Sequence, residues 1–401
     1  MKVSDRANKC QLSPMRKFHP FAVQAKSQGK TVYHLNIGQP DLPTPNAFFE
    51  ATKGFTQETL AYAPSPGMPV LIEAIGNYYE KMGIHYTSDD IFVTTGGSEA
   101  LLYTCLSILN PDDEVIIPEP YYPNYRTFVN AAGGVIRALP TCPEEGYRYA
   151  VRERIEKLIN EKTRAIMFTN PGNPTGVVLN EDEMRMMADI AKEHDLFLIS
   201  DEVYREFCYN DSGKIPCMGH FDDIADNLII IDSVSKRFSS CGARIGCVIT
   251  KNKDLQNALM KFCQSRLSVA TLDQIGSAAL YGVDDDYLKE SIREYRHRRD
   301  VCIAGLRKIP GVLVEEPMGA FYVMAKLPVD DTDKFQHWLL TEFDDKGETV
   351  MYAPGAPFYA TEGSGVNEVR IAYVLEEKDL ARALELLGLG IAHYQKEKMG
   401  L

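Results

Sequence analysis

A lysine near the middle of the chain lies where folds with a central sheet place reactive groups. Lys236 follows Ser233 and Ser235, directly after the apolar run at 228–231, which is typical of a buried strand. The carboxyl end of such a strand is where α/β folds bind their ligands. A lysine amine in that place can form a Schiff base with a carbonyl compound. The chain has 43 lysines and arginines in all, so this interpretation depends on the residues that share the edge with Lys236.

Other expected strands also end in polar residues. Since parallel strands end at one edge of a sheet, these residues should converge with Lys236. They are Gly97 and Ser98 after the strand at 91–95, Asn173 after 165–169, Asp201 and Tyr204 after 196–200, and Arg244 eight residues beyond the lysine.

One end of this set suits a phosphate. Gly97 and Ser98 open an expected helix, and free N–H groups at a helix N-terminus bind anions. Arg244 can hold the same phosphate through two parallel hydrogen bonds. Taken singly, Ser98 is equally well explained as a helix N-cap, and Arg244 as a surface ion pair.

The other end suits a heteroaromatic ring. A buried Asp201 needs a cationic partner, which a protonated ring nitrogen supplies. Asn173 and Tyr204 can hydrogen-bond a ring hydroxyl, and Tyr122 can stack on the ring; the alternatives are a turn at Asn173 and core packing at Tyr122. A phosphate, a protonated ring with a hydroxyl and an aldehyde that captures Lys236 together describe pyridoxal 5′-phosphate (PLP).

The elements that must position these residues alternate along the chain. Strands are expected at 91–95, 114–118, 165–169, 196–200, 228–231 and 246–250, with a short one near Arg137. Helices are expected at 98–109, 122–132 and 181–194, with another ending at 155–160. This alternation predicts an α/β fold with a doubly wound, mostly parallel sheet.

The flanking regions have a different pattern. Residues 1–45 are irregular, and after 285 a long helix at 287–306 precedes short strands near 312–315, 319–325 and 369–374, with a helix from 378 to 387. We expect a large PLP-binding domain at 46–285 and a smaller α+β domain at 286–401. The N-terminal segment 1–45 should join the smaller domain, since chain ends often lie close together.

In combination the motifs resemble the class I/II aminotransferases of PLP fold type I, in the aspartate aminotransferase group. The resemblance runs from about Tyr33 to the last helix, and it includes Asn173-Pro174-Thr175-Gly176 and the lysine–arginine spacing described above. It implies a PLP-dependent transaminase that works by a ping-pong mechanism, with aspartate and 2-oxoglutarate as the first-choice pair.

The resemblance also implies a role for each matching residue. Lys236 forms the Schiff base and moves the proton, Asp201 keeps the ring nitrogen protonated, and Tyr204 binds the ring hydroxyl with Asn173, which also lies at the substrate. The phosphate lies among Gly97, Ser98, Ser233, Ser235 and Arg244, and Tyr122 stacks on the ring. Gly38 and Arg370 bind the substrate, and Tyr62 reaches into the partner subunit's site, which implies a homodimer with shared active sites.

The preferred substrate is left open by the sequence. The resemblance implies that some relatives have a lysine or another polar residue at the position of Ser98, which helps to select acidic side chains. Arg266 and Arg16 are candidates for a distal carboxylate, and surface roles are the alternative for both. Transaminases for aromatic or aliphatic amino acids, and PLP enzymes of another reaction type such as C–S lyases, share the same motifs.

Composition excludes several other classes. Net charge is −13, which argues against nucleic acid or an anionic membrane as partner. The nine cysteines have irregular spacing, which favours reduced thiols over a disulfide framework or a zinc site. We find no signal peptide, no transmembrane run, no helix-turn-helix region ahead of Tyr33 and no GxGxxG motif. A cytoplasmic enzyme is therefore expected.

Overall fold

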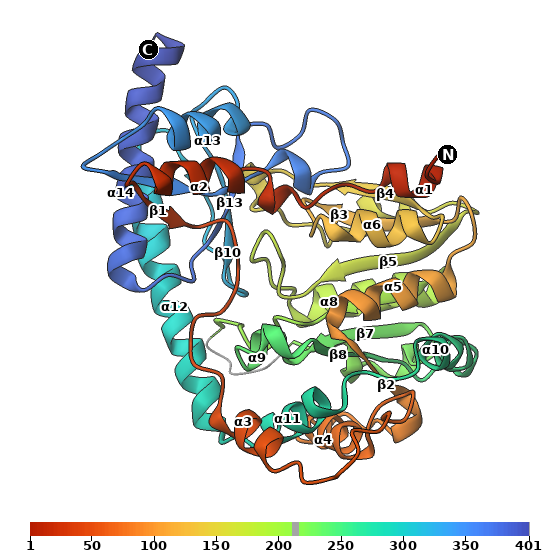
Figure 1. Ribbon diagram of the computed structural model, residues 1–401. Coiled ribbons are helices and arrows are strands. Elements are labelled where there is room, and N and C mark those ends of the chain that lie inside the picture. The colour runs from red at the N-terminus through yellow and green to blue at the C-terminus, as the bar shows by residue number, and fades with distance from the viewer. Residues whose placement is uncertain (211–215, 401) are drawn as a thin grey trace.

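A seven-stranded sheet forms the centre of the protein (Figure 1). The computed structural model describes residues 1–210 and 216–400. In spatial order the strands are β2 (Ile91–Thr95), β8 (Ile245–Ile249), β7 (Leu228–Ser233), β6 (Phe197–Asp201), β5 (Thr163–Thr169), β3 (Glu114–Glu119) and β4 (Val135–Pro140). Strand β8 is antiparallel to both of its neighbours, and the other pairs are parallel. The predicted mostly parallel sheet is confirmed.

The register places the polar strand ends at one level. Asp201, the last residue of β6, pairs with Thr169, the last residue of β5. Because β8 runs in the opposite direction, its first residue, Ile245, pairs with Thr95 at the end of β2. Arg244, which directly precedes β8, therefore lies at the edge where the parallel strands end.

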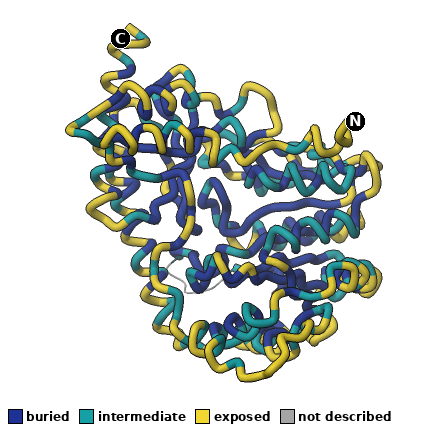
Figure 2. Tube along the Cα trace, viewed as in Figure 1, coloured by how far each residue is buried: buried dark blue, intermediate teal, exposed yellow. Residues whose placement is uncertain are grey.

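Helices cover both faces of this sheet. Successive residues of β7 point to opposite sides, so that Ile229 packs in one apolar cluster and Ile230 in another. Helices α5 (Gly96–Ile108), α6 (Asn124–Ala131) and α10 (Lys253–Arg266) contribute to the first cluster, and α4 (Pro69–Glu80) and α8 (Glu181–Glu193) to the second. Helix α7 (Arg152–Glu156) packs on α8, and α3 (Asn46–Lys53) and α11 (Thr271–Leu280) pack together beside α4. Figure 2 shows the central strands buried beneath these helices.

A second group of elements has its own apolar core. An antiparallel sheet has the order β12 (Ala353–Pro354), β13 (Glu368–Ala372), β10 (Tyr322–Lys326) and β9 (Leu313–Val314), and β1 (Thr31–His34) pairs in parallel with β11 (Glu348–Met351). The accompanying helices are α2 (His19–Ser27), α12 (Asp285–Arg307), α13 (Thr332–Thr341) and α14 (Glu377–Tyr394). Helix α1 (Asp5–Lys9) lies apart from this group and packs on α6.

One local prediction is wrong. Residues 1–45 are not irregular, since they contain α1, α2 and β1. The helix expected to end at 155–160 ends at Glu156, within that range, and in the following turn the Asn160 side chain accepts the N–H of Lys162 at 2.8 Å. The domain boundaries at 46 and 286 remain a proposal, which the pairing of β1 with β11 supports; residue 401 lies outside the described part of the chain.

In the described part of the chain, no helix combines the length and the apolar character that crossing a bilayer requires.

Candidate active site

A pocket of about 320 Å³ lies at the edge where the central strands end. Its walls come from both groups of elements, since Asp201 ends β6 and Arg370 lies on β13. The structure brings together here all the predicted cofactor and substrate residues except Tyr62: Gly38, Gly97, Ser98, Tyr122, Asn173, Asp201, Tyr204, Ser233, Ser235, Lys236, Arg244 and Arg370.

Lys236 is held on a short helix that begins at the end of β7. Helix α9 spans Val234–Arg237, and the Ser233 hydroxyl caps it by accepting the N–H of Ser235 at 3.1 Å. The half-buried Lys236 amine donates to the Gly38 carbonyl at 2.9 Å and lies 3.6 Å from Cys241 Sγ. The acceptor is a neutral backbone carbonyl, and no carboxylate pairs with this amine in the described structure.

A buried network of charges fixes the base of this helix. Arg237 pairs with Asp232 at 2.9 Å and with Glu206 at 3.2 Å, while Arg205 pairs with the same Asp232 at 2.9 Å and with Glu202 at 2.6 Å. Burial alone would raise the pKa of Asp232, but the two guanidinium groups outweigh burial and hold that pKa below its usual value. Paired charges of this kind are costly to separate, so the backbone around Lys236 is firmly placed.

Asp201 is a buried acid without a cation. Its carboxylate accepts the Tyr125 hydroxyl at 2.5 Å and the Val203 amide at 3.3 Å, and it has no ion pair with any described residue. Burial raises the pKa of Asp201 to about 6, and these two hydrogen bonds offset only part of that effect. A positive group bound next to Asp201 would remove this penalty.

Arg370 is the opposite case, a buried cation without an acid. Its guanidinium donates to Asn173 Oδ1 at 3.0 Å and to the Asn36 carbonyl at 2.7 Å, and it stacks on the Tyr322 ring at 4.4 Å. Only 3% of the residue is exposed, Nε has no hydrogen-bond partner, and no described carboxylate pairs with it. An arginine in this state suits a ligand carboxylate, whose two oxygens match its fork.

The phosphate end of the pocket is formed by close backbone contacts. Helix α5 begins at Gly96, whose φ is +70°, in the region that favours glycine. Gly246 of β8 lies so close that a Cβ there would be 2.7 Å from the Gly97 nitrogen. The exposed Arg244 donates to the Cys241 carbonyl at 3.0 Å and has no ion pair among the described residues. The helix N-terminus and this arginine therefore offer donors to an anion.

Aromatic residues include two functional candidates that sequence reasoning missed. Tyr322 lines the pocket, and its hydroxyl lies 2.9 Å from the Tyr204 hydroxyl and donates to the Gly38 carbonyl at 3.3 Å. Tyr125 holds Asp201, as described above. Tyr322 lies in an apolar stretch near an expected strand and Tyr125 in an expected helix, where an aromatic residue indicates core packing. Tyr122 forms a half-buried wall of the pocket, and burial raises its pKa to about 12.

Of the three other residues considered from the sequence, Arg16 lies in the pocket and Tyr62 and Arg266 lie outside it. Tyr62 is 80% exposed and lies outside the pocket of its own chain. Arg266 also lies outside, and it is already paired with Glu99 at 3.3 Å. Arg16 lines the pocket from the N-terminal segment. Of the two arginines considered for a distal carboxylate, only Arg16 is in place within this chain.

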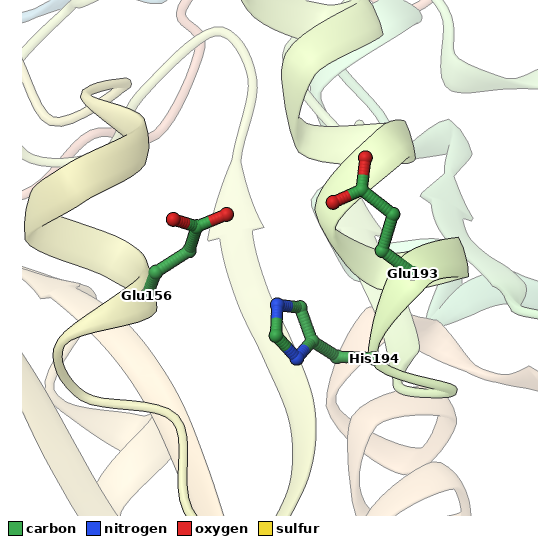
Figure 3. A group of neighbouring side chains, drawn as sticks. All are labelled: Glu156, Glu193 and His194. Carbon is green, nitrogen blue, oxygen red and sulfur yellow. The ribbon is translucent and has the colours of Figure 1, made fainter.

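A cluster of acidic and imidazole side chains lies elsewhere on the surface. Figure 3 shows Glu156, Glu193 and His194 near one another. Arg152 bridges the two carboxylates, at 2.8 Å from each, and it lowers the pKa of Glu193 through that hydrogen bond. The closeness of the two carboxylates is therefore explained by their shared ion pairing with Arg152.

The unpaired groups of the pocket fit PLP. A protonated ring nitrogen would pair with Asp201, and a phosphate would bind to Arg244 and the start of α5. The aldehyde would react with the amine of Lys236. The sheet order and this pocket define a PLP-dependent enzyme of fold type I.

Comparison with known proteins identifies the family. The chain belongs to the aminotransferases of class I and II, whose family model matches residues 30–387. A probable aspartate/prephenate aminotransferase from Thermus aquaticus is 32% identical over 372 residues, which cover 91% of this chain and 92% of the relative.

Solved structures agree with this assignment. The aspartate aminotransferase from Thermus thermophilus with maleate has a TM-score of 0.88 and 29% identity, covering 97% of this chain and all of that one. An alanine aminotransferase from Pyrococcus furiosus has a TM-score of 0.89 and 28% identity, covering 98% and 100%. The chain is thus a PLP-dependent aminotransferase, which confirms the predicted family, fold type and cofactor.

Proposed function

We propose that this aminotransferase moves the amino group between L-aspartate and 2-oxoglutarate, both of them small-molecule substrates. The names of the relatives from Thermus support this pair. The observation that carries an amino-acid or oxo-acid substrate is Arg370, a buried arginine with no described acid beside it and an Nε without a described partner, in the same pocket as Lys236. The choice of aspartate over other amino acids rests on the names of the relatives. The alanine aminotransferase among the structural neighbours makes L-alanine the second candidate donor.

The pocket residues would divide the work as follows. PLP, when bound, supplies an electron sink for the bond that breaks at the substrate Cα. Asp201 holds the proton on the ring nitrogen, and Arg370 fixes the α-carboxylate through its fork. Lys236 then moves the proton at the substrate Cα, since no carboxylate of the described residues pairs with its amine and retains it.

The remaining pocket residues would hold the cofactor and the substrate in register. Ser233, Ser235, Gly97, Ser98 and Arg244 are proposed to bind the phosphate. Asn173 and Tyr204 would hydrogen-bond the ring hydroxyl, and Tyr122 would stack on the ring. Gly38 would lie against the substrate.

A homodimer with shared sites is part of this proposal. The exposed Tyr62 lies on the same surface hollow as Leu60 and Ala270, and Leu267 nearby is 51% exposed. Apolar side chains exposed together are typical of an interface. Such a contact would let Tyr62 reach the partner's pocket. A cytoplasmic location remains a prediction from the sequence.

A half-reaction with a single amino acid tests the substrate. The purified holoenzyme is mixed with L-aspartate alone, and the absorbance band of the lysine-bound cofactor is followed. We expect stoichiometric loss of the band and one equivalent of oxo acid, with kcat/KM for L-aspartate above that for L-alanine. A higher value for L-alanine would favour the second candidate, and no conversion of any amino acid would refute the proposal.

Lys236→Ala tests the assignment of the lysine. The variant should still bind PLP, as measured by equilibrium titration, but without the absorbance band of a lysine adduct, and it should lose turnover by several orders of magnitude. Lys251→Ala, which removes a half-buried lysine that lies outside the pocket and pairs with Asp222, is the matched control. Substantial turnover by Lys236→Ala would contradict the assignment.

Subunit hybrids test the role of Tyr62. A Lys236→Ala dimer and a Tyr62→Ala dimer are mixed under conditions that exchange subunits. If Tyr62 acts across the interface, each hybrid dimer contains one intact site, and activity rises above that of both parents. If activity stays at the parental sum although hybrids have formed, Tyr62 does not act in the partner's pocket.

A further inference from the structure

A loop that follows β12 packs against Arg370, and we call residues 356–361 the latch loop. It begins with the 3₁₀ helix Ala356–Phe358, and β12 itself pairs with the strand that carries Arg370. The fully buried Phe358 ring lies 5.1 Å from the Arg370 guanidinium, and the Tyr322 ring lies 4.4 Å from it. Arg370 therefore contacts two aromatic rings, and the position of one of them depends on the latch loop.

A buried glutamate fastens the latch loop to the central sheet. Glu119 is the last residue of β3 and is 2% exposed. Its carboxylate accepts the N–H of Ala360 at 2.8 Å, the N–H of Thr361 at 3.1 Å and the Thr361 hydroxyl at 2.6 Å. No described cation pairs with Glu119, so these three donors offset the cost of burying its carboxylate.

The stretch of chain that follows this glutamate joins the latch loop to the cofactor side of the pocket. The Tyr121 N–H donates to the Phe358 carbonyl at 2.8 Å. The next residue, Tyr122, forms a wall of the pocket, and the Tyr125 hydroxyl donates to Asp201 at 2.5 Å. One short segment of the large group of elements thus supports the ring site and holds the latch loop.

A second buried carboxylate ties the latch loop to the strand of Arg370. Glu368 lies on β13, two residues before Arg370, and accepts the Tyr359 hydroxyl of the latch loop at 2.6 Å. It also accepts the hydroxyl of Tyr147, which packs in the apolar cluster of the central sheet, at 2.9 Å. The latch loop is therefore held between Glu119 and the strand that carries Arg370, so that its displacement would strain both attachments.

We infer that Glu119 is a positioning residue for substrate binding, which holds Arg370 ready for a carboxylate by fastening the latch loop. The inference rests on the proposed function, in which Arg370 binds the α-carboxylate of the amino acid or oxo acid. No described hydrogen bond or ion pair joins Glu119 to Arg370, so the effect passes through Phe358. An arginine whose fork is already oriented loses less freedom when a carboxylate binds to it.

Steady-state kinetics of Glu119→Gln are the first test. Glutamine has nearly the same shape, but its NH₂ group faces donors of the latch loop that need an acceptor. KM for L-aspartate should rise about tenfold, as for the loss of a charged hydrogen bond. At the same time kcat should stay within about twofold, because an oriented Arg370 stabilises the bound substrate and the transition state alike.

Two further variants bracket this effect. Thr361→Val removes one donor to Glu119 at an exposed position, so KM should rise in the same direction by a smaller factor without risk to the fold. Glu114→Gln is the matched control, because Glu114 is the first residue of β3 and its carboxylate accepts from Asn160 outside the pocket. This control should leave KM and kcat unchanged.

A double-mutant cycle separates positioning of Arg370 from a general effect on the fold. In an Arg370→Ala background no guanidinium is left to orient, so Glu119→Gln should change kcat/KM of the half-reaction with L-aspartate by less than about twofold. The Kd of PLP, measured by equilibrium titration, should be unchanged in Glu119→Gln. Thermal unfolding of each holoenzyme checks that the variants are folded at the assay temperature.

Several results would overturn the inference. An unchanged KM in Glu119→Gln would mean that the latch loop does not need the carboxylate, and a fall in kcat alone would place the effect on the chemical step. Equal losses with and without Arg370 would show a general structural role, and a weakened affinity for PLP would show that Glu119 acts on the ring wall. In all these cases conversion of amino acids by the unaltered enzyme would leave the proposed transamination standing, whereas its absence would refute that function.

Discussion

Removing the charge of Asp201 should stabilise the cofactor-free protein while abolishing its function. The carboxyl has a pKa of about 6, above its ordinary value of 3.8, because it is buried. A pKa difference of one unit corresponds to about 1.4 kcal/mol, so ionised Asp201 lowers the free energy of unfolding by up to about 3 kcal/mol at pH 7. Asp201→Asn removes this penalty and has nearly the same shape.

The hydrogen bonds of the site can survive the substitution. The new amide can accept from the Val203 N–H and donate to the Tyr125 oxygen, because that hydroxyl also lies 2.5 Å from Thr169 Oγ1 and can donate to it. Some loss at these contacts is expected, so the net gain should be about 1 to 3 kcal/mol at pH 7.

The pH dependence gives the sharper test. An acid whose pKa is raised on folding binds more protons in the native state, so its destabilising effect is absent below pH 3.8, grows up to about pH 6 and is constant above that. Urea unfolding of both cofactor-free proteins at pH 5 and pH 7, at equal protein concentration, should show a larger advantage for Asp201→Asn at pH 7. The difference should grow by about 1.4 kcal/mol.

Two results would refute this reasoning. If Asp201→Asn is less stable than the unaltered protein at pH 7, the carboxylate is compensated by a cation that the described contacts do not include. If the stability difference is the same at pH 5 and pH 7, the pKa of Asp201 is not raised. As a companion measurement, PLP should stabilise the unaltered protein more than the variant, since only the former supplies an anion for the ring nitrogen.

Two further substitutions test other parts of the site. Arg237→Met should lower the free energy of unfolding in urea by about 3 to 5 kcal/mol, because two buried carboxylates each lose a partner. The control Arg152→Met removes exposed ion pairs and should lower it by at most about 1 kcal/mol. Equal losses would mean that the network does not hold the lysine helix. Gly38→Ala would place a Cβ 1.9 Å from the Tyr322 hydroxyl, so kcat/KM should fall about tenfold or more. The double variant Gly38→Ala/Tyr322→Ala should recover part of this loss. Normal kinetics of the single variant would show that Gly38 does not face that ring.

Much of the central fold could be predicted from the sequence. Strands such as β2 and β7 are short apolar runs that end in polar or glycine residues, and helix α8 has a capping box at Asn180 and an apolar stripe. These signals are local, so a single sequence contains them. The convergence of Asp201, Lys236 and Asn173 followed from the rule that parallel strands end at one edge.

What was missed depends on contacts between distant parts of the chain. Strand β1 is four residues long and pairs with β11 more than 300 residues later, which no local pattern reveals. Tyr322 and Tyr125 look like core residues in sequence because only the assembled pocket shows that their hydroxyls reach Tyr204 and Asp201. The buried pairing of Arg237 likewise required the fold, because adjacent charges in a sequence are usually solvated.

The reversed direction of β8 has a consequence for how the protein acquires its cofactor site during folding. Because β7 and β8 are antiparallel neighbours, the loop between them closes locally, and it carries both Lys236 and Arg244. Contacts between residues close in sequence lose little entropy on closure and form early. Asp201 and the start of α5 also precede residue 250, so the lysine, the phosphate donors and the ring acid can meet while the C-terminal third of the chain is still being synthesised. Arg370 arrives only with the last strands, so the growing chain can form its cofactor site before its substrate site exists.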